Sequence, residues 1–280
     1  MSIIIDGKAV AAEVRSQIKE KCAEIVANGG KTPKLAILLV GNNPASEVYV
    51  SSKEKACAET GIESLVVRLP ENSEIDEIIC AVDKLCADET IDGVMVQLPL
   101  PGGIDAKPVL DRIPFEKDVD GLNSASAGRA FHGEKCLIPC TPKGIVRLLK
   151  KYEVPLAGKH AVIIGRSNLV GKPMSILLLN ENCTVTICHS KTENLEAYTK
   201  SADILVVAVG KPGFVTGDMI KKGAAVIDVG ISRTEHGLKG DVDFDSALEA
   251  AGYITPVPGG VGPMTVAMLL ENTLEALALK

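Results

Sequence analysis

The chain has 280 residues, of which 46% are apolar, and it carries a formal net charge of −6 at neutral pH. A chain of this length can bury enough apolar surface for two domains. The negative charge argues against nucleic acid as the main partner, and an aromatic content of 3% without tryptophan argues against stacking platforms for bases or sugars.

Two targeting signals are missing from the sequence. No apolar run approaches the roughly 20 residues that a membrane-spanning helix needs. The first residues lack a basic region and already contain an acid at Asp6, so they do not resemble a signal peptide. We therefore expect a cytoplasmic protein that does not act on a membrane.

The eight cysteines include no CxxC pair. In a long chain without a signal peptide they are expected to be reduced, mostly buried thiols. The sharpest candidates for metal ligands are spaced by four residues: His132, Cys136 and Cys140. Gly133, Pro139 and Pro142 are expected to break any helix there, and a second ligand pair is missing, so we predict no metal site.

Apolar strands alternate with helices in the first hundred residues. The predicted elements are a helix over 6–28, a strand over 34–40, a helix over 44–60, a strand over 63–69, a helix over 73–88 and a strand over 93–98. The uninterrupted apolar run 35–40 is typical of a parallel sheet that is covered on both faces. Repeated strand–helix units of this kind predict a wound α/β domain.

A second domain is predicted after a segment rich in proline and glycine, 99–145, which we interpret as a crossover between domains. Strands are then expected over 159–164, 184–188, 204–209 and 225–229, with helices over 173–180 and 263–277. The last helix has Pro263 in its first turn, where proline is favoured. The fold class is therefore two wound α/β domains, the second of them Rossmann-like.

A candidate phosphate-binding loop connects the strand 159–164 to the following helix. Gly165 and Gly171 bracket this loop, where a backbone can approach a pyrophosphate and present N–H groups. The spacing is not GxGxxG, so the simple fingerprint fails. Taken alone, the loop is equally well explained as a tight strand-to-helix turn.

The end of the next strand favours NADP over NAD. An NAD site usually places an acid there to bind the ribose 2′-hydroxyl. Here the strand is followed by His189, Ser190 and Lys191, with Arg166 close enough in the fold to reach the same region. A guanidinium and a hydroxyl suit a 2′-phosphate. His189 and Lys191 are also explained as solvated loop residues.

A candidate amine site begins on the helix 44–60, where Tyr49 and Lys53 share one face. Gln97 ends an apolar strand, and ligands of open α/β sheets bind beyond such strand ends. An amide beside a partly desolvated amine can keep it neutral or orient it for proton transfer. The alternatives are a solvated Lys53 and a buried, satisfied Gln97.

Two aspartates, Asp118 and Asp120, follow in the segment 99–145. Asp120 could bind the amidine-like N–H groups of a substrate. Both aspartates could instead form the turn before Gly121.

Several blocks of the sequence resemble the bifunctional methylenetetrahydrofolate dehydrogenase/methenyltetrahydrofolate cyclohydrolase family. They cover nearly the whole chain in order: VGNNPAS (40–46) with Tyr49 and Lys53, VQLPLP (96–101), KDVDG (117–121), PCTP (139–142), GRSNLVGKP (165–173), CHSKT (188–192) and PVPGGVGPMT (256–265). Two departures are Gly103, where a histidine is common, and Ser232, where an asparagine is expected.

The resemblance implies oxidation of 5,10-methylenetetrahydrofolate by NADP and hydrolysis of the methenyl product to 10-formyltetrahydrofolate, within one-carbon metabolism that serves purine and amino-acid biosynthesis. It gives Lys53 the proton-transfer role, with Gln97 tuning it, Tyr49 stacking on the folate and Asp120 binding the pterin. The remaining residues it assigns to the folate are Leu98, Pro258, Gly259, Gly260, Val261 and Gly262. Those it assigns to NADP are Gly165, Arg166, Ser167, Ser190 and Ile231.

The resemblance also implies a domain arrangement. We expect a folate-binding catalytic domain over 1–120, completed by the C-terminal helix 263–280, and an NADP-binding domain over 139–262. The folate cleft is expected between the two domains, and the protein is expected to be a homodimer, typically through its nucleotide domain. A dehydrogenase-only relative and a non-catalytic NADP sensor are the competing hypotheses. Lys53, Gln97 and Asp120 together argue against the first. A sensor would be expected to have an empty amine site, and the presence of these three residues and Tyr49 argues against it.

Overall fold

A computed structural model describes residues 2–235 and 237–279, which form two compact units. Among these residues, one unit contains 12–140 and 266–279, and the other contains 2–11, 141–235 and 237–265. Three helices each contain a boundary between the units: α1 (Gly7–Ala27), α6 (Cys140–Lys151) and α10 (Val261–Ala276). The first of these units is called the amine unit below, and the second is called the nucleotide unit.

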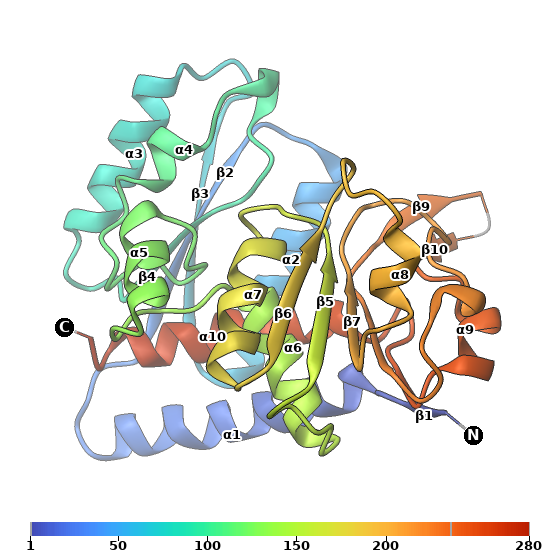
Figure 1. Ribbon diagram of the computed structural model, residues 1–280. Helices are drawn as coiled ribbons and strands as arrows, with labels where there is room; N and C mark the ends of the chain where they lie inside the picture. The colour runs from blue at the N-terminus through green and yellow to red at the C-terminus, as the bar shows by residue number, and fades with distance from the viewer. Residues whose placement is uncertain (1, 236, 280) are drawn as a thin grey trace. The chain divides into compact units, whose positions relative to one another are not determined.

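The described part of the amine unit contains a three-stranded parallel sheet in the order β3-β2-β4 (Figure 1). Its strands are β2 (Lys34–Val40), β3 (Glu63–Leu69) and β4 (Gly93–Val96). Its other helices are α2 (Pro44–Thr60), α3 (Ile75–Ala87), α4 (Lys107–Leu110) and α5 (Ser124–His132), with a 3-10 turn η1 (Pro101–Gly103). Leu35 to Val40 are all buried, as expected for a central strand covered on both faces.

The nucleotide unit contains, among its described residues, a six-stranded sheet in the order β1-β11-β8-β7-β5-β6, and all pairings in it are parallel. Its strands are β1 (Ile3–Ile4), β5 (His160–Ile164), β6 (Thr184–Cys188), β7 (Ile204–Val207), β8 (Ala225–Asp228) and β11 (Tyr253–Ile254). The unit also holds α6 (Cys140–Lys151), α7 (Gly171–Asn180), α8 (Leu195–Thr199), η2 (Gly217–Met219), the hairpin β9 (Ser232–Thr234) and β10 (Gly237–Lys239), and α9 (Phe244–Ala250).

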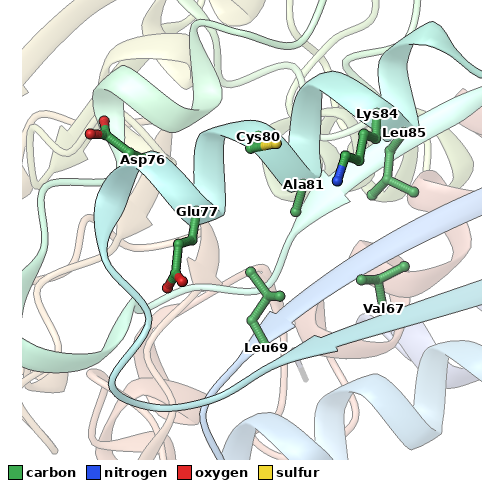
Figure 2. A pocket seen from close by; sticks show the side chains of 8 residues that line it. All are labelled: Val67, Leu69, Asp76, Glu77, Cys80, Ala81, Lys84 and Leu85. Atoms are coloured by element: carbon green, nitrogen blue, oxygen red, sulfur yellow. The ribbon is translucent and has the colours of Figure 1, made fainter.

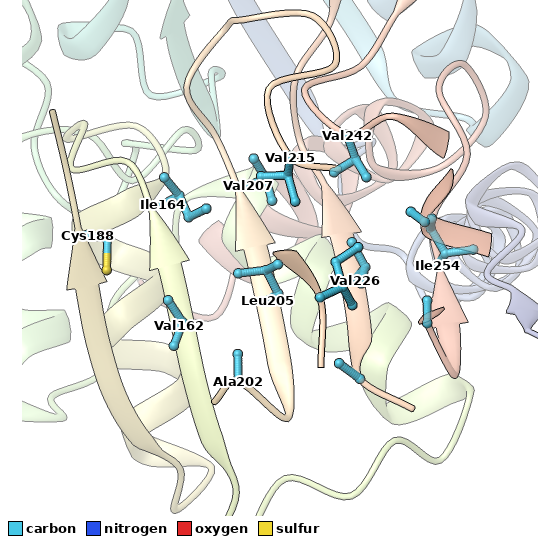
Figure 3. Packing of buried hydrophobic residues seen from close by; sticks show 14 residues of the cluster. Val162, Ile164, Cys188, Ala202, Leu205, Val207, Val215, Val226, Val242 and Ile254 are labelled. Atoms are coloured by element: carbon cyan, nitrogen blue, oxygen red, sulfur yellow. The ribbon is translucent and has the colours of Figure 1, made fainter. Parts of the chain in front are cut away.

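The strand order of the nucleotide unit reverses at β5, because β6 lies on one side of it and β7 on the other. Buried side chains from β5, β7, β8 and β11 pack together in one core, in which Val162, Leu205 and Val226 are completely buried (Figure 3). A reversal of this kind opens a crevice at the carboxyl ends of the strands, where ligands of such sheets bind. The predicted fold class, two wound α/β domains with a Rossmann-like second one, is confirmed.

One expectation about the crossover segment is wrong. Pro142 does not break a helix, because it lies in the first turn of α6, which begins at Cys140. The first turn tolerates proline because its N–H groups have no partner within the helix. Gly133 does end a helix, since it takes the left-handed conformation at the C-terminus of α5 with φ 70°.

Candidate active site

Lys53 and Tyr49 lie one turn apart on α2, whose two ends follow from local sequence. The Asn43 side chain accepts hydrogen bonds from the N–H groups of Ala45 and Ser46, at 2.9 and 3.3 Å, and so caps the first turn. Gly61 ends the helix in the left-handed conformation with φ 78°. Lys53 is partly buried, whereas the Tyr49 side chain is half exposed.

Gln97 meets Lys53 directly after β4. The Lys53 Nζ donates a hydrogen bond to the Gln97 Oε1 at 2.8 Å, and the Gln97 Nε2 donates to the carbonyl oxygen of Leu98 at 2.8 Å. Gln97 is buried, so its amide is both satisfied and fixed in orientation by these two bonds. The structure thus brings together three of the predicted residues, Lys53, Gln97 and Leu98.

The surroundings of Lys53 shift its protonation equilibrium toward the neutral amine. Burial lowers the pKa of Lys53 below its usual value, and the charge of Asp120 opposes this shift. Burial also raises the pKa of Asp120, and here the charge of Lys53 opposes the shift. Each charge partly offsets the desolvation of the other, because a nearby opposite charge favours the charged form of a group.

Asp120 is held in place by the two charged residues that precede it. The buried Lys117 donates to the carbonyl oxygens of Cys86 and Asp88 at the end of α3, at 2.8 and 2.7 Å. The Asp118 carboxylate accepts hydrogen bonds from the N–H of Asn123 at 2.9 Å and from the hydroxyl of Ser126 at 2.7 Å. Asp118 therefore forms the turn, which is one of the roles that the sequence left open, whereas Asp120 interacts electrostatically with Lys53.

The sequence suggested Cys140 only as a metal ligand and gave no role to Asn272, and both side chains lie close to this site. The Cys140 thiol is buried, 3.3 Å from the carbonyl oxygen of Val119 and 3.7 Å from the Asp120 Oδ1. The Asn272 Nδ2 donates to the carbonyl oxygens of Val119 and Ile138, both at 2.8 Å. The PCTP block was the available signal for Cys140, but nothing in the sequence pointed to Asn272.

The predicted phosphate loop has little room for side chains. Gly165 has φ 125°, and a Cβ there would overlap the carbonyl oxygen of Ala208. A Cβ at Gly171 would overlap the carbonyl oxygen of Gly165. The N–H groups of Arg166 and Ser167 bond to no backbone carbonyl of the described chain, and α7 begins just beyond them. This bare, exposed backbone at a helix N-terminus fits a dinucleotide phosphate.

The residues predicted to select NADP follow two strands, β5 and β6, that end side by side. Ile164 pairs with Cys188 in the register of β5 and β6, and Gly165 N–H donates to the Cys188 carbonyl oxygen at 2.9 Å. Arg166 follows the first strand and Ser190 follows the second, and both are exposed. Within the described residues, neither side chain makes a hydrogen bond or an ion pair, so both are available to a ligand. An arginine and a hydroxyl in these positions fit a 2′-phosphate.

Ile231 and the glycine loop 258–262 belong to the nucleotide unit. The exposed Ile231 follows β8, and its Cδ1 would lie 3.4 Å from a Cβ built on Gly262. A hydrogen bond from the first turn of α1 stabilises this loop, because Lys8 N–H donates to the Gly259 carbonyl oxygen at 2.9 Å. The helix α10 begins at Val261, two residues before its predicted start, so Val261 and Gly262 lie in its first turn.

A further hollow lies outside the candidate site. It has a volume of about 600 Å³ and lies between β3 and α3, where Val67 and Leu69 face Ala81 and Leu85, and it contains none of the predicted site residues (Figure 2). Across residues 2–235 and 237–279, no three His, Cys, Asp or Glu side chains are grouped to hold a metal ion. No helix in the same ranges is long and apolar enough to cross a membrane.

Comparison with known proteins covers both units. Residues 5–120 match the catalytic domain of tetrahydrofolate dehydrogenase/cyclohydrolase, and residues 139–280 match the NAD(P)-binding domain of the same family. The bifunctional protein FolD of Moorella thermoacetica is 55% identical over 274 residues, which cover 98% of each chain.

Solved structures agree with this assignment. The FolD methylenetetrahydrofolate dehydrogenase/cyclohydrolase of Campylobacter jejuni superposes with a TM-score of 0.97 at 47% identity, covering 100% of this chain and 99% of the other. The enzyme of Trypanosoma brucei, solved with NADP cofactor and an inhibitor, gives a TM-score of 0.93 at 39% identity, covering 99% and 98%. The resemblance noted in the sequence is confirmed, and the chain belongs to the tetrahydrofolate dehydrogenase/cyclohydrolase family.

Proposed function

We propose that Lys53, Gln97 and Asp120 carry the hydrolytic half of a bifunctional folate enzyme. As a member of its family, the protein oxidises 5,10-methylenetetrahydrofolate with NADP and hydrolyses the 5,10-methenyl product to 10-formyltetrahydrofolate. The observation that carries the residue assignment is the 2.8 Å hydrogen bond from Lys53 to Gln97, made by an amine whose pKa burial lowers.

Hydrolysis of the methenyl cation is general acid–base chemistry. The attacking water must lose a proton, and the ring nitrogen that leaves the carbon must gain one. A neutral Lys53 amine can donate one N–H to Gln97 and still keep its lone pair to accept the proton of the water. A protonated Lys53 would repel the cationic substrate, so the lowered pKa favours both binding and reaction.

The other folate-side residues have binding roles in this proposal. Asp120 binds the N–H groups of the pterin through its carboxylate, and the exposed ring of Tyr49 stacks on the folate. Leu98, Pro258, Gly259, Gly260, Val261 and Gly262 line the folate site. We assign these roles to a catalytic domain over 1–120, completed by the helix 263–280, and assign coenzyme binding to the domain over 139–262.

The dehydrogenase half needs positioning and no protein base. NADP, when bound, accepts a hydride from the methylene carbon of the folate. Gly165 and Ser167 would bind its pyrophosphate through the backbone of the loop. Arg166 and Ser190 would bind its 2′-phosphate. Ile231 would contact its nicotinamide end. A dehydrogenase-only enzyme and a sensor are disfavoured because neither would need the assembled pair of Lys53 and Gln97.

The quaternary structure and location complete the proposal. We infer a homodimer formed through β6, which has β5 as its one neighbour in the described sheet and carries the exposed Ile187. The helix α7, which packs against β6, carries the exposed Leu179. All eight cysteines lie within the described residues and are free thiols, which supports a cytoplasmic location. There the enzyme would belong to the one-carbon metabolism that serves purine and amino-acid biosynthesis.

The variant Lys53→Met tests the central assignment, because methionine is similar in length and cannot accept a proton. Cyclohydrolase activity should be abolished, while the dehydrogenase retains a measurable fraction, since hydride transfer requires positioning alone. Both rates can be followed by absorbance, separating the methenyl product from reduced coenzyme. Lys55→Met, on an exposed position of the same helix, is the matched control. Hydrolysis by Lys53→Met within a few-fold of the parent would refute the assignment.

A further inference from the structure

Two buried aspartates of the nucleotide unit belong to neither predicted site. Asp228 is the last residue of β8 and is 4% exposed, and Asp241 is completely buried. A buried carboxylate is costly unless hydrogen bonds satisfy it. The partners of these two carboxylates therefore show what they hold in place.

Asp241 binds three consecutive N–H groups of one loop. Its Oδ2 accepts from Val209 at 2.7 Å and from Gly210 at 2.9 Å, and its Oδ1 accepts from Lys211 at 2.7 Å. This loop follows β7, which ends at Val207. Charge-assisted hydrogen bonds to three neighbouring amides fix the course of the backbone more firmly than a turn alone.

Asp228 in turn holds Asp241 and the loop that follows β8. Its Oδ1 accepts from the N–H of Gly230 at 3.0 Å and of Asp241 at 2.9 Å, and its Oδ2 accepts from Val242 at 2.9 Å. Burial raises the pKa of Asp228 to about 6, and its backbone hydrogen bonds oppose that rise. Gly230 directly precedes Ile231, so the two carboxylates form one chain of contacts between the loops after β7 and β8.

The carboxylates of Asp228 and Asp241 are closely confined by the neighbouring backbone. A Cβ at Gly230 would overlap the Asp241 carboxylate, and a Cβ at Gly240 would overlap that of Asp228. Val215 and Val242 form an isolated bridge and are buried in the core beside Val207 (Figure 3). The chain of carboxylates therefore rests on the rigid part of the unit.

We propose that Asp228 and Asp241 are positioning residues for the coenzyme, which fix the loops 209–211 and 229–231 at the carboxyl ends of β7 and β8. Ligands of a wound sheet bind at this edge. The loop after β7 also lies against the phosphate loop, because Gly165 packs on the carbonyl group of Ala208. The inference rests on the proposed NADP site and adds two residues that position its loops.

The decisive variants are Asp241→Asn and Asp228→Asn. Each turns one acceptor oxygen into an amide NH₂ that faces a backbone N–H and repels it. The dissociation constant for NADP, measured by calorimetry, should rise about tenfold, which corresponds to about 1.4 kcal/mol. The kcat of the cyclohydrolase, assayed without coenzyme at saturating substrate, should stay at the parent value because Lys53 and Gln97 lie in the amine unit.

Hydrogen exchange of the coenzyme-free protein supplies a second readout. The amides of 209–211 should exchange faster in Asp241→Asn than in the parent. The matched control is Asp203→Asn, at the amino end of β7, where Asp203 accepts from His160 N–H at 3.0 Å and pairs with Lys221 at 2.7 Å. This control should leave NADP binding unchanged.

Three results would overturn the proposal. The first is an NADP dissociation constant that is unchanged in both variants. The second is a loss of coenzyme binding that is matched by equal losses of cyclohydrolase activity and of melting temperature. The third is a failure of both variants to fold. Each would assign the two carboxylates to the fold rather than to the coenzyme. A parent protein that binds no NADP would instead contradict the proposed function itself.

Discussion

Lys53 illustrates how surroundings give a common residue an uncommon property. Lysines on helices are usually solvated and charged, yet here burial lowers the pKa of the amine and Gln97 fixes its direction. The nearby Asp120 opposes the shift and keeps the pKa from falling further. The pH dependence of hydrolysis should therefore depend on a carboxylate that takes no proton from the water.

Replacing Asp120 with asparagine should move the pH profile of hydrolysis to lower pH. Without the carboxylate charge, the pKa of Lys53 falls further below its usual 10.5, so the amine becomes neutral, and active, at a lower pH. The measurement is kcat for methenyltetrahydrofolate against pH at saturating substrate, which separates the effect from weaker pterin binding. Asp83→Asn, which removes an exposed ion pair with Arg112, is the control. A profile that keeps the parent position would show that Asp120 does not tune the amine.

Arg166→Ala should raise the KM for NADP and change that for NAD little. A hydrogen bond to a charged group contributes about 1.5–3 kcal/mol, which corresponds to roughly a tenfold to hundredfold rise. Initial rates of the dehydrogenase with each coenzyme give the comparison. Equal losses with both coenzymes would mean that Arg166 positions the loop and not the 2′-phosphate.

The residues of the amine site were predictable only in part. Tyr49 and Lys53 could be paired from their spacing on one helix, and Gln97 from its place at a strand end. The contact of Asn272 with Val119 spans 153 residues of sequence. An amide that binds backbone carbonyls can meet any residue type, so no spacing rule indicates such a partner.

Elements whose ends carry clear sequence signals were predicted with the correct first and last residues. The bounds of β2, α2 and β3 agree with expectation, because α2 has an asparagine cap, a proline in its first turn and a glycine at its end. The helices α4 and α5 were missed within the crossover segment, and α6 was missed at its end, because frequent prolines and glycines hid the helical periodicity. Short elements such as β1 and β11 have two residues each, too few to show any period.

The junction between β5 and α7 should not tolerate a side chain at its first residue. Gly165→Ala places a Cβ onto the Ala208 carbonyl oxygen, in a backbone conformation with φ 125° that L-residues rarely adopt. NADP binding should therefore be lost or severely weakened, whereas hydrolysis of added methenyltetrahydrofolate should persist. Calorimetric titration with NADP checks the first expectation, and Gly158→Ala, where a Cβ meets no atom within 4 Å, controls for the loss of a left-handed glycine. Parent-like NADP affinity in Gly165→Ala would contradict the tight loop.

At the scale of the whole molecule, the two-domain α/β fold was predictable because each unit repeats the strand–helix alternation. The position of the folate cleft between the domains stays a prediction. Chain connectivity was harder to foresee, since the first eleven residues belong to the unit that otherwise begins at Thr141. Their pairing with β11 involves strands too short to leave a pattern in the sequence.

The predicted homodimer can be tested at the edge of the larger sheet. Ile187→Asp puts a charge on β6, where the side chain is 37% exposed, and should shift the protein from dimer to monomer. Light scattering coupled to size-exclusion chromatography measures the mass. Leu238→Asp, on β10 and 47% exposed, should leave the mass unchanged. An Ile187→Asp protein with the parent mass would place the interface elsewhere.

The pairing of β1 with β11 has a consequence for the order of events during synthesis. Ile3 lies opposite Tyr253, so its partner is made 250 residues later. At about 5–20 residues per second, the ribosome needs roughly 12–50 seconds to reach that partner. The strands β2, β3 and β4 are all complete by Val96, so the smaller sheet can assemble while the first strand of the chain is still waiting for its neighbour. The strand β1 is therefore among the last strands that can pair with a neighbour.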